Sequence, residues 1–176
     1  MSNLRMPIDD IKDQIRFNCG RNWNNYSTTN CYAYALGLDI PEERIITKAY
    51  QPGTIGSTIY NIDLNNKSLE EKIYADLRAL QITYSDCSQS EISCYDFDND
   101  SIIIQWIIAL FINRKDETDF HFMRKAWDNN WWHKRGHNLE RPLNYDDMFK
   151  TIYNPEECEL YDYKYIKCLK LNCKVK

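Results

Sequence analysis

The stretch that decides the fold is Ser101–Ile112, SIIIQWIIALFI, which is dominated by β-branched and aromatic residues. Apolar side chains occupy both its odd and its even positions, and Gln105 is the main interruption. A strand with two apolar faces is typical of the centre of a sheet that is covered on both sides, and it does not suit a surface helix. We therefore expect this segment to be the central strand of the domain.

Strand signals continue after this segment. Asp119–Trp127 and Trp131–Arg135 flank Asp128-Asn129-Asn130, a composition typical of turns, so these residues predict a hairpin. Tyr161–Cys173 alternates apolar and polar residues, which predicts a half-exposed strand. The second half of the chain is thus expected to form an antiparallel sheet.

Helical patterns precede the strands. Pro7 is followed by isoleucines at helical spacing, and Ser68 with Glu71 forms a capping-box pattern ahead of an apolar helical face. Gln51-Pro52-Gly53 predicts a turn between these regions. Helices followed by an antiparallel sheet indicate an α+β fold, with N-terminal helices packed on the sheet.

The composition limits the class of protein. A chain of 176 residues fits one domain, residues 1–176, and its net charge of −4 excludes a nucleic-acid binder built on bulk positive charge. The start of the chain carries charges throughout, and the longest apolar run is too short for a membrane span, so we expect no membrane association. Seven cysteines, an odd number, favour free thiols in a reducing compartment and hence a cytoplasmic location.

Cys31 is the most informative single residue. It follows Asn30, a good helix-capping residue, and opens the segment CYAYAL, which Gly37 is expected to end. A thiol at a helix N-terminus lies beside unpaired backbone N–H groups, which favour the thiolate and can stabilise an oxyanion. The competing interpretation is that Cys31 is a small buried apolar residue without chemical function.

The histidines of this chain are His121, His133 and His137, all within the predicted hairpin region. A neutral imidazole is the usual base for a thiol near neutral pH. The hairpin register decides which residue can orient His121. A three-residue tip places His121 opposite His137, a two-residue tip places it opposite Gly136, and a wider tip or a bulge places it opposite His133. Periodicity does not choose among these registers.

The residues NCYAYAL, the QPG turn, DFHFMR and WWHKRG together resemble the NlpC/P60 and CHAP branch of the papain-like cysteine hydrolases. The resemblance covers the cysteine helix and the hairpin, and Asn30-Cys31-Tyr32-Ala33 departs from the usual residues around the nucleophile. It implies a papain-like α+β domain with a Cys31–His121–His133 triad. It also implies an oxyanion-stabilising Asn25, and Trp132 is expected to wall the substrate cleft.

Such a triad would hydrolyse or transfer an amide or acyl group through an acyl-enzyme, with no cofactor or metal. The expected partner is a peptide or another amide-containing substrate. Two alternatives stay open. The first is a catalytically degenerate papain-like fold that binds a protein or ligand. The second is a zinc site in which Cys31, His121 and His133 are three ligands.

Overall fold

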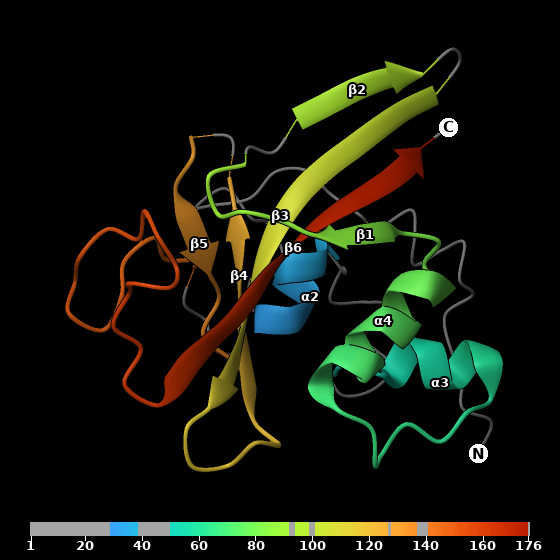
Figure 1. Ribbon diagram of the computed structural model, residues 1–176, viewed down its shortest axis with the longest axis horizontal. Helices are drawn as coiled ribbons and strands as arrows, with labels where there is room; N and C mark the ends of the chain where they lie inside the picture. Colours follow the sequence, from blue (N-terminus) through green and yellow to red (C-terminus); the bar gives the residue numbers. More distant parts are fainter. Residues whose placement is uncertain are drawn as a thin grey trace.

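The computed structural model describes residues 29–38, 50–91, 94–98, 101–126, 128–136 and 141–175 (Figure 1). The predicted helix after Pro7 lies outside these residues. Within them the elements are α2 (Cys31–Leu36), α3 (Thr54–Tyr60), α4 (Leu69–Ala79), β1 (Thr83–Asp86), β2 (Cys94–Asp98), β3 (Ser101–Asn113), β4 (Phe120–Lys125), β5 (Trp131–His133) and β6 (Tyr163–Val175). None of the helices in this part of the chain is long and apolar enough to cross a membrane.

The strands form one six-stranded antiparallel sheet in the order β1-β6-β3-β4-β5, with β2 also paired to β3. The strand expected from Ser101–Ile112 is β3, and it pairs with β2, β4 and β6. The α+β class and the central strand are therefore confirmed. The hairpin is confirmed as β4 and β5, and the last predicted strand as β6.

The helices expected after Asn30 and after Ser68 are also confirmed, as α2 and α4. The side chain of Ser68 accepts a hydrogen bond from the backbone of Glu71, and the Glu71 side chain bonds back to the backbone of Ser68, so α4 begins with a full capping box. The helix α3 and the strands β1 and β2 were not predicted from the sequence. These elements are short, and α3 is mostly small or β-branched residues, whose helix propensity is low.

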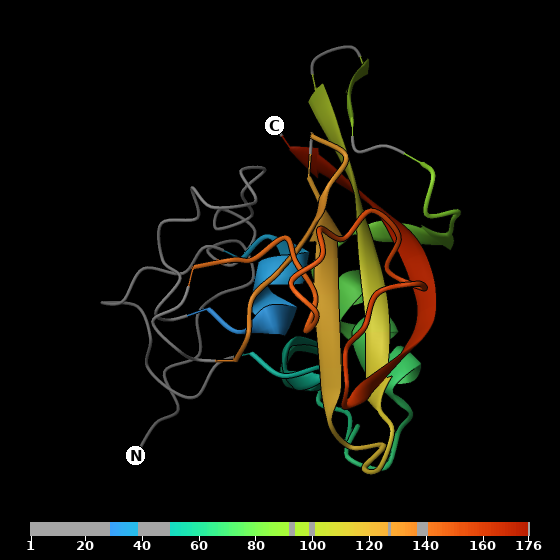
Figure 2. The ribbon, with the colours of Figure 1, turned by 90° about the vertical axis from the view of Figure 1, so that its left-hand side faces the viewer.

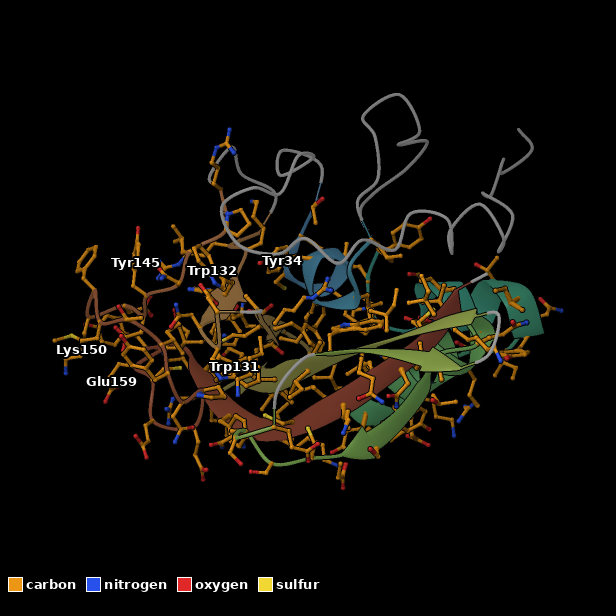
Figure 3. All side chains as sticks on the ribbon, turned by 90° about the horizontal axis from the view of Figure 1, so that it is seen from above. Tyr34, Trp131, Trp132, Tyr145, Lys150 and Glu159 are labelled. Carbon is orange, nitrogen blue, oxygen red and sulfur yellow. The ribbon has the colours of Figure 1, made fainter. Side chains whose placement is uncertain are left out.

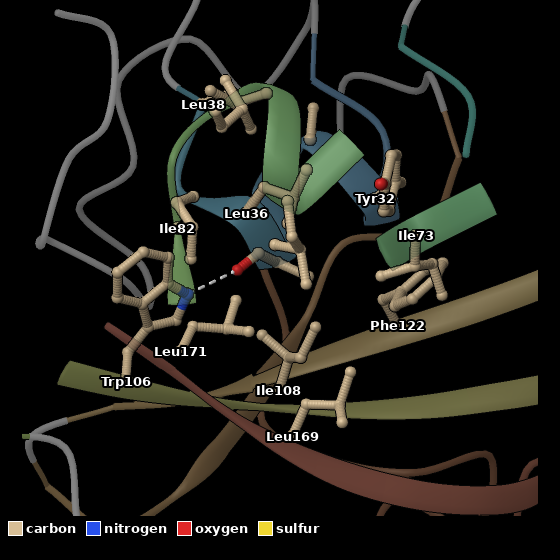
Figure 4. Packing of buried hydrophobic residues seen from close by; sticks show 14 of the residues in the cluster. Tyr32, Leu36, Leu38, Ile73, Ile82, Trp106, Ile108, Phe122, Leu169 and Leu171 are labelled. Atoms are coloured by element: carbon tan, nitrogen blue, oxygen red, sulfur yellow. Dashed lines mark hydrogen bonds between the residues drawn. The ribbon is translucent and has the colours of Figure 1, made fainter. Parts of the chain in front are cut away.

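Each face of the sheet is covered by a hydrophobic cluster. One contains α2 and α4 together with Trp106, Ile108, Phe122 and Leu171 (Figure 4), and the indole of Trp106 donates a hydrogen bond of 3.0 Å to the carbonyl oxygen of Ala35. The other contains Ile107, Ala109, Phe111, Met123 and Trp131, with Ile152 and Leu160 from the segment before β6. Figure 2 shows α2 beside β4, so the helix that begins with Cys31 is held against the strand that carries His121.

Candidate active site around Cys31, His121 and His133

Cys31 is the first residue of α2, as predicted. Asn30 is the N-cap, and its side chain accepts a hydrogen bond of 2.8 Å from the backbone N–H of Ala33. The Asn30 amide also donates to the carbonyl of Tyr50 at 2.8 Å, which holds the capping residue from a second side. Gly37 ends the helix in the left-handed conformation, with φ 77°. These contacts fix the backbone that carries the Cys31 thiol.

The environment of this thiol differs from the sequence expectation. Cys31 is 6% exposed, and burial raises the pKa of its thiol to about 12. A backbone hydrogen bond to Phe122 lowers that pKa, whereas the negative charge of Asp119 raises it further. The sequence predicted a helix N-terminus that favours the thiolate. The helix has only six residues, and burial outweighs its effect, so the thiol is neutral at rest.

His121 and His133 are hydrogen-bonded to each other. Nε2 of His121 and Nδ1 of His133 lie 2.8 Å apart, and the two rings are nearly perpendicular, at 88°. The expected partnership is thus present, but the register that produces it was not among the three considered. In the structure Met123 lies opposite His133 and Lys125 opposite Trp131, and the backbone N–H of Ala126 donates to the carbonyl of Asn130 at 2.9 Å.

In this register His121 and His133 are diagonal neighbours on one face of the hairpin, and the two rings meet across that diagonal. The prediction that the pair must be directly opposite was therefore wrong. Diagonal neighbours are about 7–8 Å apart at their backbones, within reach of two imidazoles. His137 lies outside the described residues.

A backbone carbonyl fixes the tautomers of this pair. Nε2 of His133 lies 2.9 Å from the carbonyl oxygen of Tyr145, and a carbonyl can only accept, so this nitrogen carries the proton. In a neutral His133, Nδ1 then has a free lone pair and must accept from Nε2–H of His121. The remaining nitrogen, Nδ1 of a neutral His121, is consequently unprotonated and able to take up a proton.

Burial keeps both imidazoles neutral. His121 is 7% exposed and His133 is fully buried. Burial lowers the pKa of His121 well below its ordinary value, and the neighbouring His133 and Arg135 lower it further. Burial likewise lowers the pKa of His133 to about 4, although its hydrogen bond to Tyr145 acts in the opposite direction. Both imidazoles are therefore neutral at neutral pH, and each binds a proton less readily than an ordinary histidine does.

The thiol and the imidazoles approach β4 from different sides. Phe122 faces the cluster that contains α2, and successive side chains of a strand alternate, so His121 points to the other face. Beyond His133, β5 no longer pairs with β4, which leaves the backbone of Phe122 open to the Cys31 thiol. Cys31 thus lies at the edge of β4, against the residue that follows His121.

Asp119 and Tyr163 also belong to this site, and neither was predicted from the sequence. The hydroxyl of Tyr163 donates to Asp119 at 2.8 Å, and its ring centroid lies 5.4 Å from that of His121. The charge of Asp119 acts on the Cys31 thiol, and the pKa of Tyr163, raised mainly by burial, is raised further by Cys31. Asp119 could have been found by alternation, since it precedes His121 by two. Tyr163 could not, because a bulge in the β3–β6 register brings it to this face.

Trp132, the expected cleft residue, lies on the side of the sheet where α2 and Tyr34 are found, whereas Trp131 points to the opposite side (Figure 3). Trp132 is partly exposed, and its indole N–H is buried without a hydrogen-bond partner among the described residues. Asn25, the expected oxyanion residue, lies outside the described residues.

The described residues contain no group of three or more His, Cys, Asp or Glu placed to hold a metal ion, so the zinc alternative gains no support.

Comparisons with models of known protein families, with curated proteins and with solved structures find no match for this chain.

Proposed function

We propose that this chain is a cysteine hydrolase of papain-like type, acting on an amide or acyl bond of a peptide or similar substrate. The observation that carries the proposal is the hydrogen-bond relay from the Tyr145 carbonyl through His133 to His121. Such a relay gives the general base a defined tautomer, which is the role of the third member of a catalytic triad.

In the proposed reaction, Sγ of Cys31 attacks the substrate carbonyl carbon as its proton passes to Nδ1 of His121. The imidazolium then returns this proton to the leaving group, and water hydrolyses the resulting thioester. The Cys31 thiol and the His121 imidazole are both neutral at rest. The proton therefore passes from Cys31 to His121 only during attack on a bound substrate. The negative charge of Asp119 would favour the imidazolium formed during attack, because its carboxylate accepts from Tyr163, whose ring lies beside that of His121.

Trp132 supports a substrate-binding role on the α2 side of the site. A buried indole N–H without a partner is uncommon in folded proteins and costs stability. A substrate carbonyl oxygen would satisfy it. We therefore assign Trp132 to substrate binding and expect Trp132→Phe to raise KM more than it lowers kcat.

The proposal is tested by acylating the full chain with p-nitrophenyl acetate and mapping the modified peptides by mass spectrometry. We expect acetylation of Cys31 that is abolished in Cys31→Ala and reduced at least 100-fold in His121→Ala, a loss typical of removing a general base. Cys173→Ala, which removes another buried thiol, is the matched control and should react like the parent. Acetylation of other thiols with Cys31 left unmodified would contradict the proposal.

A crystal structure provides a second, independent test. The mechanism requires Sγ of Cys31 within about 4 Å of Nδ1 of His121, or joined to it through one water. A separation above about 7 Å, beyond a water-bridged path, would exclude the proposed proton transfer.

The burial of Cys31 favours a second candidate, a papain-like fold that binds a protein or ligand without turnover. A neutral, 6% exposed thiol on the α2 side of β4 is also what a packing residue would show. In that case Cys31→Ala and His121→Ala would leave the interaction intact, and the acetylation experiment would give no Cys31 adduct.

A further inference from the structure

Two thiols, Cys87 and Cys168, lie with the hydrophobic cluster on the face of the sheet opposite the cluster that contains Cys31. Cys87 follows the last residue of β1 and Cys168 is within β6, and both are free. The β1–β6 register pairs Asp86 with Leu169, and one further step along both strands sets Cys87 opposite Cys168. The backbone N–H of Cys87 donates to the carbonyl of Cys168 at 3.4 Å, which continues the ladder to this pair.

Directly opposite residues of an antiparallel ladder present their side chains on the same face, with Cα atoms about 5.5 Å apart in a hydrogen-bonded pair. Disulfides are formed across Cα separations of about 4.4–6.8 Å. Cys168 belongs to the cluster that contains Ile107 and Trp131, Cys87 packs against that cluster, and Cys168 raises the pKa of the Cys87 thiol. The spacing and the shared face therefore match what a cross-strand bridge needs.

The surroundings hold this pair in place. The ammonium group of Lys125 donates at 2.7 Å to the carbonyls of Gln89 and of Glu91, so the segment after Cys87 is fastened over the sheet. The hydroxyl of Tyr165 lies 3.3 Å from Sγ of Cys168. Cys87 is partly exposed and Cys168 is 2% exposed, so a reagent from solvent meets Cys87 first.

We propose that Cys87 and Cys168 are a redox modification site that reacts with a small-molecule disulfide, such as oxidised glutathione, and closes to a cross-strand disulfide. The Cys87 sulfur bonds to one sulfur of the small disulfide to form a mixed disulfide, and the other sulfur leaves as a thiol with the Cys87 proton. The Cys168 sulfur then attacks the Cys87 sulfur, and the second small thiol leaves with the Cys168 proton. Two protein thiols are oxidised and one small disulfide is reduced to two thiols.

This site is independent of the proposed hydrolase. Burial raises the pKa of Cys87 to about 12 and of Cys168 to about 11, so both thiols are protonated at neutral pH and the exchange is slow. Thiols of high pKa are also poor leaving groups, so the bridge, once formed, resists reduction. The bridge would fasten β1, an end strand of the sheet, to β6.

The test is incubation of the reduced full chain with oxidised glutathione, followed by non-reducing peptide mapping and thermal unfolding. We expect one linked peptide pair, Cys87 with Cys168, and a rise in Tm of about 5–10 °C that a reductant reverses, because the bridge closes a long loop of the unfolded chain. Cys87→Ser and Cys168→Ala should each abolish both effects, and Cys158→Ser, another partly buried thiol beside the same cluster, should leave them unchanged.

Two results would overturn the inference: a bridge from either thiol to Cys158, or glutathione retained on Cys87 without closure. Cys87→Ser changes a partly exposed position, so its folding, checked by circular dichroism, separates loss of the bridge from loss of the fold.

Discussion

The carboxylate of Asp76 accepts a hydrogen bond of 2.7 Å from the hydroxyl of Tyr32, the residue that follows Cys31. It also accepts from the backbone N–H groups of Gly53 at 2.7 Å and Gly56 at 2.6 Å. Asp76 is fully buried, and burial raises its pKa to about 6 although these three donors lower it. One carboxylate on α4 thus joins the start of α3 to the first turn of α2.

Asp76→Asn should destabilise the protein by about 2–4 kcal/mol, because an amide has one acceptor oxygen and turns an NH₂ group toward donors that then lack a partner. Urea unfolding measures this loss. The control is Asp63→Asn, at an exposed position whose carboxylate caps only its own turn, and it should change stability by less than about 0.5 kcal/mol. Equal stability of the two variants would contradict the role given to Asp76.

Gly56→Ala should also be destabilising, by about 2–3 kcal/mol, although alanine is favoured over glycine inside a helix by about 1 kcal/mol. A Cβ at this position would lie 2.7 Å from the backbone carbon of Ala75 and 2.8 Å from its carbonyl oxygen. Backbone atoms cannot move aside as a flexible side chain can, so α3 and α4 must separate. The control for helix propensity is Ser57→Ala, at the next residue of α3. A gain in Tm for Gly56→Ala would contradict the close packing of α3 against α4.

His133→Asn should retain more activity than His133→Leu, if the relay acts as proposed. The asparagine oxygen can still accept from Nε2–H of His121, whereas leucine removes the acceptor and frees the tautomer. We expect the rate of Cys31 acetylation to fall by about 10-fold in His133→Asn and by about 1,000-fold in His133→Leu. Similar rates for the two variants would show that His133 only fills space.

Asp119→Asn should make Cys31 react faster with iodoacetamide, by roughly two- to five-fold near pH 8. The negative charge of Asp119 raises the pKa of the Cys31 thiol, so its removal increases the thiolate fraction, while the amide oxygen still accepts from Tyr163. Asp116→Asn removes a charge from the same loop and is the matched control. An unchanged rate in Asp119→Asn would show that the charge of Asp119 does not affect the ionisation of the Cys31 thiol.

The elements with the strongest local signals were predictable from the sequence. The two apolar faces of β3, the Asn30 and Gly37 caps of α2 and the capping box of α4 are each set by residues close together in the chain. The contact between His121 and His133 was expected from the resemblance, and the structure contains it.

The predictions that failed concern features set by contacts between residues that are distant in the sequence. Turn composition does not encode the register that sets Met123 opposite His133, because register depends on which faces of the paired strands are buried. The position of Tyr163 depends on a bulge in β6, and the neutral state of Cys31 depends on burial by other elements. Local pattern therefore predicts which elements form, and tertiary packing decides which side chains meet and how they ionise.

Acidification should destabilise the protein through the buried histidines. His133 binds a proton near pH 6.5 in the unfolded chain and only near pH 4 in the folded one. Between these values the unfolded state holds more protons, so the free energy of unfolding falls as the pH is lowered, by about 3 kcal/mol for this group at pH 4. In His133→Asn this contribution is absent, and its unfolding free energy should fall by about 3 kcal/mol less than that of the parent between pH 7 and pH 4. Asp76, whose raised pKa acts in the opposite direction over part of this range, is common to both proteins and cancels in the difference. Urea unfolding at several pH values measures both slopes, and parallel slopes would mean that His133 is not buried as a neutral imidazole.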